Sequence, residues 1–150
     1  LCWRLRLLGY TNVSVPSAVI YHIGAVTYKK KSYRWSYLNH RNSIIVIIKN
    51  YSFINLIKRL PVRVFFEFIS CISFFINLDF ERGTANLMAI LWILSHPLKL
   101  INKRKDAQRL RRINDDSVNR LMITKSVVIQ YYIYKRKYFK DYLEYIPALR

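Results

Sequence analysis

Very few residues in this sequence can break a helix. Only 3 Gly and 4 Pro occur among the 150 residues, and these two residue types most often end helices and form turns. The long stretches between them are therefore expected to be helical. Because 53% of the residues are hydrophobic, the chain is also apolar enough to form a core, which argues against a disordered chain.

The charge of the chain is strongly positive and unevenly distributed. The formal net charge is +18 at pH 7, and no acidic residue precedes Glu67. Such an excess predicts a polyanionic partner: nucleic acid, an anionic bilayer or a phosphorylated substrate. The aliphatic run at residues 44–48 favours the bilayer, because membrane-surface proteins combine apolar area with Lys and Arg. We therefore expect an anionic membrane surface as the partner, and no nucleic acid.

Two long apolar segments follow one another in the middle of the chain. Residues 62–78 are nearly all apolar but contain Arg63 and Glu67, and residues 84–101 are interrupted at Pro97. Crossing a bilayer takes about 20 apolar residues, so the length of each segment is marginal. The pair is expected to form a re-entrant hairpin, to lie in the membrane interface or to pack against a partner. An ordinary buried hairpin is the alternative.

Basic clusters border these segments on both sides, at residues 58–63 and 103–112. Residues 114–117 have the composition of a helix cap, and residues 118–145 form a tyrosine-rich basic tail. Tyrosine together with lysine or arginine fits a helix at the headgroup boundary of a membrane. The same alternation can stack the bases of nucleic acids, which is the weaker alternative.

The first 21 residues predict a helix followed by short strands. Residues 1–8 have the pattern of a helix end, and Gly9 follows where a left-handed cap is expected. The β-branched runs at residues 12–15 and 18–21 predict two strands.

Residues 33–51 lack Gly and Pro and show helical spacing, so they predict one long helix. A second, short helix is expected at residues 52–60, with Pro61 opening the next element. Glu67 and Asp79 lie within or beside the apolar segments and could be ion-paired with Arg63 or Arg82, and no catalytic role is assigned to them.

Three segments carry a resemblance to a known family: Leu-Cys-Trp-Arg-Leu-Arg-Leu-Leu-Gly-Tyr at residues 1–10, Val-Pro-Ser-Ala-Val-Ile-Tyr-His at 15–22 and Tyr-Leu-Asn-His-Arg-Asn-Ser at 37–43. They resemble the end of the GT-A domain in family 2 glycosyltransferases, with rhamnosyltransferase-like members the nearest. The resemblance covers the first third of the chain. Two departures stand out, because Ala25 occupies a position where members often have glycine, and the nucleotide-binding half with its aspartate pair does not appear.

The resemblance implies an α/β GT-A fold, of which this chain would be a C-terminal fragment. This chain by itself would be mainly helical, with a short two-strand piece followed by membrane-associated helices. Residues 1–51 would end the catalytic domain, residues 52–113 would form the apolar and basic membrane-associated helices, and residues 114–150 the helical tail. The catalytic base would precede Leu1, so the fragment is expected to contain no catalytic residue and to be inactive alone.

Four residues are candidates for binding the diphosphate of a donor. His22 follows a predicted strand, and imidazole binds divalent metal ions or hydrogen-bonds to phosphate; the resemblance implies the same role. Lys30, within a run of lysines, could cover the phosphates, and Arg41 could offer them a planar fork. Asn42 could position Arg41 or the acceptor. The alternatives are a structural histidine, a solvated loop, a surface arginine and a helix-packing amide.

The function expected from these observations is polysaccharide biosynthesis at the cytoplasmic face of the cell membrane. A nucleotide-sugar donor would supply the sugar, and a lipid-linked or surface-polysaccharide acceptor would receive it, with inversion implied by the family. A divalent metal ion, Mg or Mn, would serve in the full-length enzyme. The alternative function is that of a non-enzymatic, basic membrane-surface protein.

Overall fold

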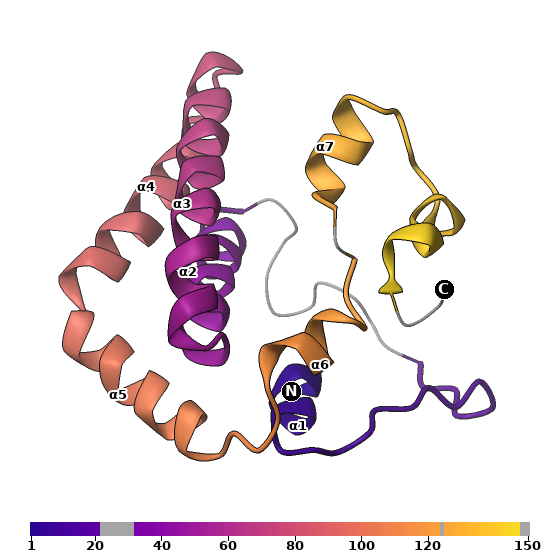
Figure 1. Cartoon of the computed structure of the whole chain (residues 1–150). Coiled ribbons are helices and arrows are strands. Elements are labelled where there is room, and N and C mark those ends of the chain that lie inside the picture. Colours follow the sequence, from indigo (N-terminus) through magenta and orange to yellow (C-terminus); the bar gives the residue numbers. More distant parts are fainter. Residues whose placement is uncertain (22–31, 124, 148–150) are drawn as a thin grey trace. The chain divides into compact units, whose positions relative to one another are not determined.

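The computed structural model describes residues 1–21, 32–123 and 125–147, and within these ranges the regular elements are all helices (Figure 1). The chain divides into two compact units, which we describe separately. One unit comprises Val13–Arg109, and the other combines Leu1–Asn12 with Leu110–Arg150.

The unit formed by residues 13–109 contains four consecutive helices: α2 (Tyr33–Asn50), α3 (Phe53–Ile76), α4 (Phe80–Ser95) and α5 (Pro97–Arg109). Helix α2 packs against each of the other three, and α3 also packs along α4 (Figure 1). The unit is therefore organised around α2, which contributes three of the four residues of the buried aliphatic cluster.

Helix α2 confirms the prediction of one long helix. It begins after Ser32, whose hydroxyl accepts a hydrogen bond from the backbone N–H of Trp35, and this satisfies one of the free donors at the helix start. Its aliphatic run is the core of the unit, where Ile44, Ile45 and Ile48 cluster with Leu100 of α5.

Helix α3 corrects the predicted boundary at Pro61. The structure shows one continuous helix with Pro61 inside it. A proline within a helix removes one backbone hydrogen bond and costs about 3 kcal/mol. Packing on the N-terminal side of the proline offsets this cost, because Leu56 and Leu60 lie against the aliphatic core of α2 and α5. Tertiary contacts of this kind are not visible in the local sequence.

Helix α4 begins at Asp79, whose side chain accepts a hydrogen bond from the backbone N–H of Arg82. Gly83 allows α3 to approach closely, since a Cβ atom there would lie 3.0 Å from the ring of Phe75. The predicted interruption at Pro97 is confirmed, because α4 ends at Ser95 and α5 leaves at an angle of 77°.

The predicted strands at residues 12–15 and 18–21 are wrong. Both segments are described, and neither forms a strand; a turn lies between them at residues 16 and 17. Their β-branched side chains are largely exposed, as for Val13 and Ile20. Isolated extended segments gain stability only when another strand pairs with them, and the described residues provide none. The expected α/β GT-A fold with a two-strand piece is therefore contradicted for the described part of the chain.

The second unit contains short helices: α1 (Cys2–Leu7), α6 (Asp115–Asn119), α7 (Val127–Tyr132) and the 3-10 helix η1 (Phe139–Tyr145). The carbonyl oxygen of buried Leu7 accepts hydrogen bonds from the backbone N–H groups of Arg112 and Ile113, which ties the two chain segments together. Gly9 has φ of 95°, as its predicted place after the first helix requires. Asn114 caps α6, which confirms the predicted cap.

Candidate functional site

The four predicted diphosphate-binding residues do not all lie in the described part of the chain. His22 and Lys30 lie outside the described residues. The prediction that His22 binds a metal ion therefore concerns a residue that the structure does not describe. Arg41 and Asn42 are neighbours on α2 and are described. The structure therefore shows the geometry of only this pair.

Asn42 holds the guanidinium of Arg41 in place. Its side-chain oxygen accepts hydrogen bonds from Nε of Arg41 at 3.2 Å and from Nη2 at 3.0 Å. The guanidinium carbon also lies 5.1 Å from the ring centre of Tyr37 and 5.0 Å from that of Trp92. Cations at such distances are attracted to aromatic rings. Arg41 is thus fixed between rings from α2 and α4. Asn42 positions Arg41, which is one of the roles that the sequence suggested for this asparagine.

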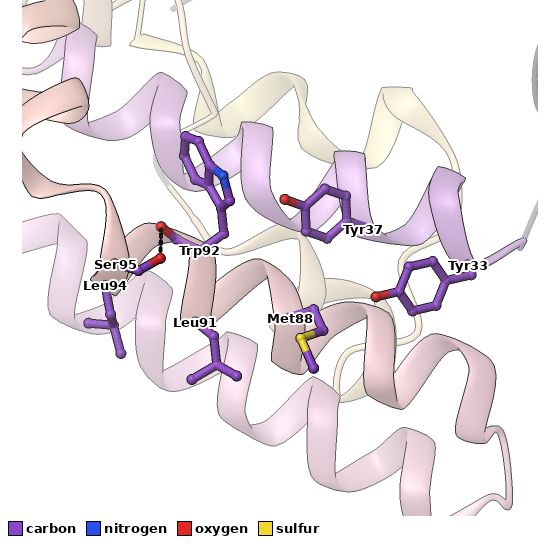
Figure 2. Close-up of a pocket in the computed structure, with 7 residues that line it drawn as sticks. All are labelled: Tyr33, Tyr37, Met88, Leu91, Trp92, Leu94 and Ser95. Carbon is purple, nitrogen blue, oxygen red and sulfur yellow. Dashed lines mark hydrogen bonds between the residues drawn. The ribbon is translucent and has the colours of Figure 1, made fainter.

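An open groove lies between α2 and α4 beside these two rings (Figure 2). Tyr33 and Tyr37 project into it from α2, and α4 contributes Trp92 together with Met88, Leu91, Leu94 and Ser95. The hydroxyl of Ser95 donates to the carbonyl oxygen of Trp92 at 3.2 Å. The groove is therefore mainly apolar, with two phenol hydroxyls as further polar groups.

A buried carboxylate lies at the contact of α2, α3 and α4. The side chain of Glu67 is only 1% exposed. Its Oε2 lies 2.6 Å from Nδ1 of His40 and 3.2 Å from Nδ2 of Asn86, and its Oε1 is paired with Arg63. Arg63 also donates to the hydroxyl of Ser43 at 2.7 Å. The carboxylate is thus hydrogen-bonded from all three helices.

These partners determine the ionisation of Glu67. Burial raises the pKa of its carboxyl group, but the hydrogen bond from His40 and the positive charge of Arg63 outweigh burial, so the pKa lies below its usual value of 4.5. An ionised carboxylate accepts hydrogen bonds only, so Nδ1 of His40 is the donor in their contact. The sequence offered Arg63 or Arg82 as a partner for Glu67, and the structure shows Arg63. No local pattern indicated the contact with His40, which comes from another helix.

The outward side of α3 is apolar as well. Nine of its aliphatic and aromatic side chains are between 46% and 75% exposed. Seven of them share one side of the helix by their spacing: Ile54, Ile57, Phe65, Phe68, Ile69, Ile72 and Ile76. Exposed apolar surface of this extent marks a binding surface for protein or lipid. We call these seven residues the α3 outer face.

Exposed cations occur on α3 itself and on α5, which belongs to the same unit. Lys58 and Arg59 lie on α3 itself, and Lys99, Lys103 and Lys105 are exposed on α5. Helix α5 also exposes Leu98 and Ile101 beside its lysines. Apolar and cationic side chains therefore occur together on both helices.

Two further properties concern the described residues only. They contain no group of three or more His, Cys, Asp or Glu side chains placed to hold a metal ion. None of their helices is by itself both long and apolar enough to cross a membrane, although α4 and α5 together meet that criterion as a bent pair.

Comparison with known proteins gave no family: no family model, no curated protein and no solved structure matches the chain.

Proposed function

We propose that residues 33–109 form a helical module that binds the surface of an anionic membrane. The observation that carries this proposal is the α3 outer face, which exposes seven large apolar side chains in the same unit as a set of exposed lysines. Interfacial helices bind bilayers by inserting apolar side chains while their cations attract anionic headgroups.

We further propose that the module serves a glycosyltransferase, which transfers sugar from a nucleotide-sugar donor to a lipid-linked or surface-polysaccharide acceptor. This part of the proposal is supported by the sequence resemblance of residues 1–10, 15–22 and 37–43 to family 2 members. A membrane-bound module would keep such an enzyme close to an acceptor that is itself in the membrane.

A non-enzymatic membrane-surface protein is the second candidate function. One observation favours it: the regular elements of the described residues are all helices, whereas the GT-A fold that the resemblance implies contains strands. The two candidates share the membrane module and differ in whether sugar transfer accompanies it. The reading frame upstream of Leu1 separates them, since an acidic motif and a nucleotide-binding domain there support the enzyme and their absence contradicts it.

Sedimentation with anionic vesicles tests the membrane module. The wild-type chain is expected to sediment with vesicles of mixed phosphatidylglycerol and phosphatidylcholine. Phe65→Ser combined with Ile72→Ser is expected to weaken binding by at least about tenfold, because each large apolar side chain contributes roughly 1.5–3 kcal/mol when buried.

The matched control replaces two exposed apolar residues outside the helices, Val13→Ser with Ile20→Ser. This variant is expected to bind vesicles as the wild type does. Helix content of both variants is compared by circular dichroism. Equal binding by the α3 variant and the wild type would remove the α3 outer face from the proposal, and absence of sedimentation by the wild type would refute the module.

A further inference from the structure

The groove between α2 and α4 has the size and lining of a ligand site. Its volume is about 690 Å³, within the range of roughly 300–1,000 Å³ that small-molecule sites occupy. Met88, Leu91 and Leu94 give it an apolar wall, and Tyr33 and Tyr37 bring aromatic rings with hydroxyl groups from the opposite helix (Figure 2). Such a lining suits a ligand that is largely hydrocarbon.

One cation lies at the aromatic side of this groove. Arg41 contacts the rings of Tyr37 and Trp92, both of which line the groove. Its hydrogen bonds within the described residues go to Asn42 and to the hydroxyl of Tyr37, and no described carboxylate forms an ion pair with it. A guanidinium has more N–H donors than these bonds use. Arg41 is therefore a pre-positioned charge that an anion can neutralise.

The charge pattern decides the chemistry of the occupant. No acidic residue lines the groove, and the rings of Tyr37 and Trp92 already hold the positive charge of Arg41, which disfavours a second cation beside them. Guanidinium pairs most strongly with the oxygens of phosphate or carboxylate, and Met88, Leu91 and Leu94 give the groove its apolar wall. An anionic headgroup attached to a long hydrocarbon chain complements both features.

We propose that the groove binds one phosphate-bearing lipid of the membrane, with its acyl chain along Met88, Leu91 and Leu94 and its phosphate at Arg41. The hydroxyls of Tyr33 and Tyr37 donate to the same headgroup. This inference rests on the proposed membrane binding, because the bilayer supplies the lipid. With such a site the module binds a phosphate-bearing lipid specifically, in addition to its general attraction to negatively charged surfaces.

Binding of monomeric lipid tests the groove without a bilayer. Equilibrium dialysis measures the binding of lysophosphatidic acid below its critical micelle concentration. The same measurement is made with two partial probes, a monoacylglycerol of the same chain length and glycerol 3-phosphate. Saturable binding of one lysophosphatidic acid per chain is expected, with each partial probe at least about tenfold weaker. Equal binding of the monoacylglycerol would show that the phosphate is not recognised, and equal binding of glycerol 3-phosphate would show a free-phosphate site; either result overturns the proposal.

Variants with matched controls locate the binding. Arg41→Gln is expected to weaken binding of lysophosphatidic acid at least about tenfold, as loss of a charge-assisted hydrogen bond does, whereas Lys58→Gln removes the same charge from α3 without effect. Leu91→Ser is expected to weaken it similarly, whereas Val13→Ser, outside the helices, leaves it unchanged. Circular dichroism confirms folding, and Leu91→Ser tests the groove independently because Leu91 is itself 46% exposed. Undiminished binding by either folded groove variant overturns the proposal.

The two proposals fail in different ways. Sedimentation with vesicles but no saturable binding of the monomeric lipid refutes the groove and leaves the membrane module intact. Monomer binding without sedimentation refutes the membrane module instead.

Discussion

Nδ1 of His40 lies 2.6 Å from Oε2 of Glu67, although 27 residues separate the two in the chain. This contact joins α2 to the middle of α3 inside a unit whose other core contacts are mainly apolar. Arg63 neutralises the same carboxylate from its own helix. A single buried acid thus fixes how two helices meet.

Replacing Glu67 by Gln is expected to destabilise the unit by about 1–3 kcal/mol, because it removes the charged acceptor of the hydrogen bonds from His40 and Arg63. Urea unfolding followed by circular dichroism measures the loss. Asp79→Asn is the control, since the Asp79–Arg82 pair is partly exposed and asparagine can still cap α4; its expected cost is below about 1 kcal/mol. Similar losses for both variants would contradict the special role of Glu67.

The stability of the unit is expected to fall in acid through the same residue. Because the pKa of Glu67 is lowered in the folded chain, its carboxylate stabilises the fold fully above the usual value of 4.5 that the unfolded chain has. This contribution is lost as the pH falls through the lower, folded-state pKa. The free energy of unfolding is measured for the wild type and Glu67→Gln from about pH 6 downward. The difference between them should shrink in acid, and a constant difference would contradict the assignment.

Salt is expected to weaken the binding of vesicles without abolishing it. The Debye length falls from about 10 Å at 0.1 M salt to about 3 Å at 1 M, so salt screens the attraction of exposed lysines to headgroups. Insertion of apolar side chains is not screened and should retain part of the bound fraction. Complete release at 1 M salt would show that charge alone holds the chain at the membrane.

The lysines of α5 are expected to account for part of this salt-sensitive binding. Lys99, Lys103 and Lys105 are exposed, and each basic residue near an anionic surface contributes about 1 kcal/mol. Replacing all three by glutamine should lower binding to anionic vesicles by at least about tenfold. Binding to purely zwitterionic vesicles is the internal control and should not change. An equal loss on both kinds of vesicle would point to a folding defect instead.

In the second unit, Asn114→Ala is expected to reduce stability by about 0.5–2 kcal/mol, because the side chain of Asn114 caps α6 through the N–H of Ser117. Asn114→Asp keeps an acceptor at the same position and should retain wild-type stability. Thermal unfolding of both variants measures the effect. If the alanine and aspartate variants were equally unstable, the cap would not be the cause.

Local features of this chain were predictable and long-range ones were not. The helix at Tyr33–Asn50, the positive φ of Gly9, the cap at Asn114 and the break at Pro97 all follow from nearby residues. So does the Arg63–Glu67 pair, whose members are four positions apart on one helix. Each of these depends on contacts within a few residues.

The features that the sequence did not predict depend on contacts between residues far apart in the chain. Pro61 lies inside α3 because tertiary packing on its N-terminal side stabilises the helix. The β-branched runs before residue 22 remain without a strand, since pairing needs a partner that no local pattern reveals. His40 meets Glu67 only after α2 and α3 pack, and the groove at Arg41 needs α4. Candidate residues could thus be named from sequence, but their neighbours could not.

The placement of Arg63 on the same helix as Glu67 also affects the order of folding. A contact between residues one helical turn apart closes with little loss of chain entropy, whereas the contact with His40 closes a much longer loop. The carboxylate therefore gains its counterion as soon as α3 forms, and His40 replaces water on its second oxygen when α2 docks. At no stage of assembly does the chain have to bury a bare negative charge.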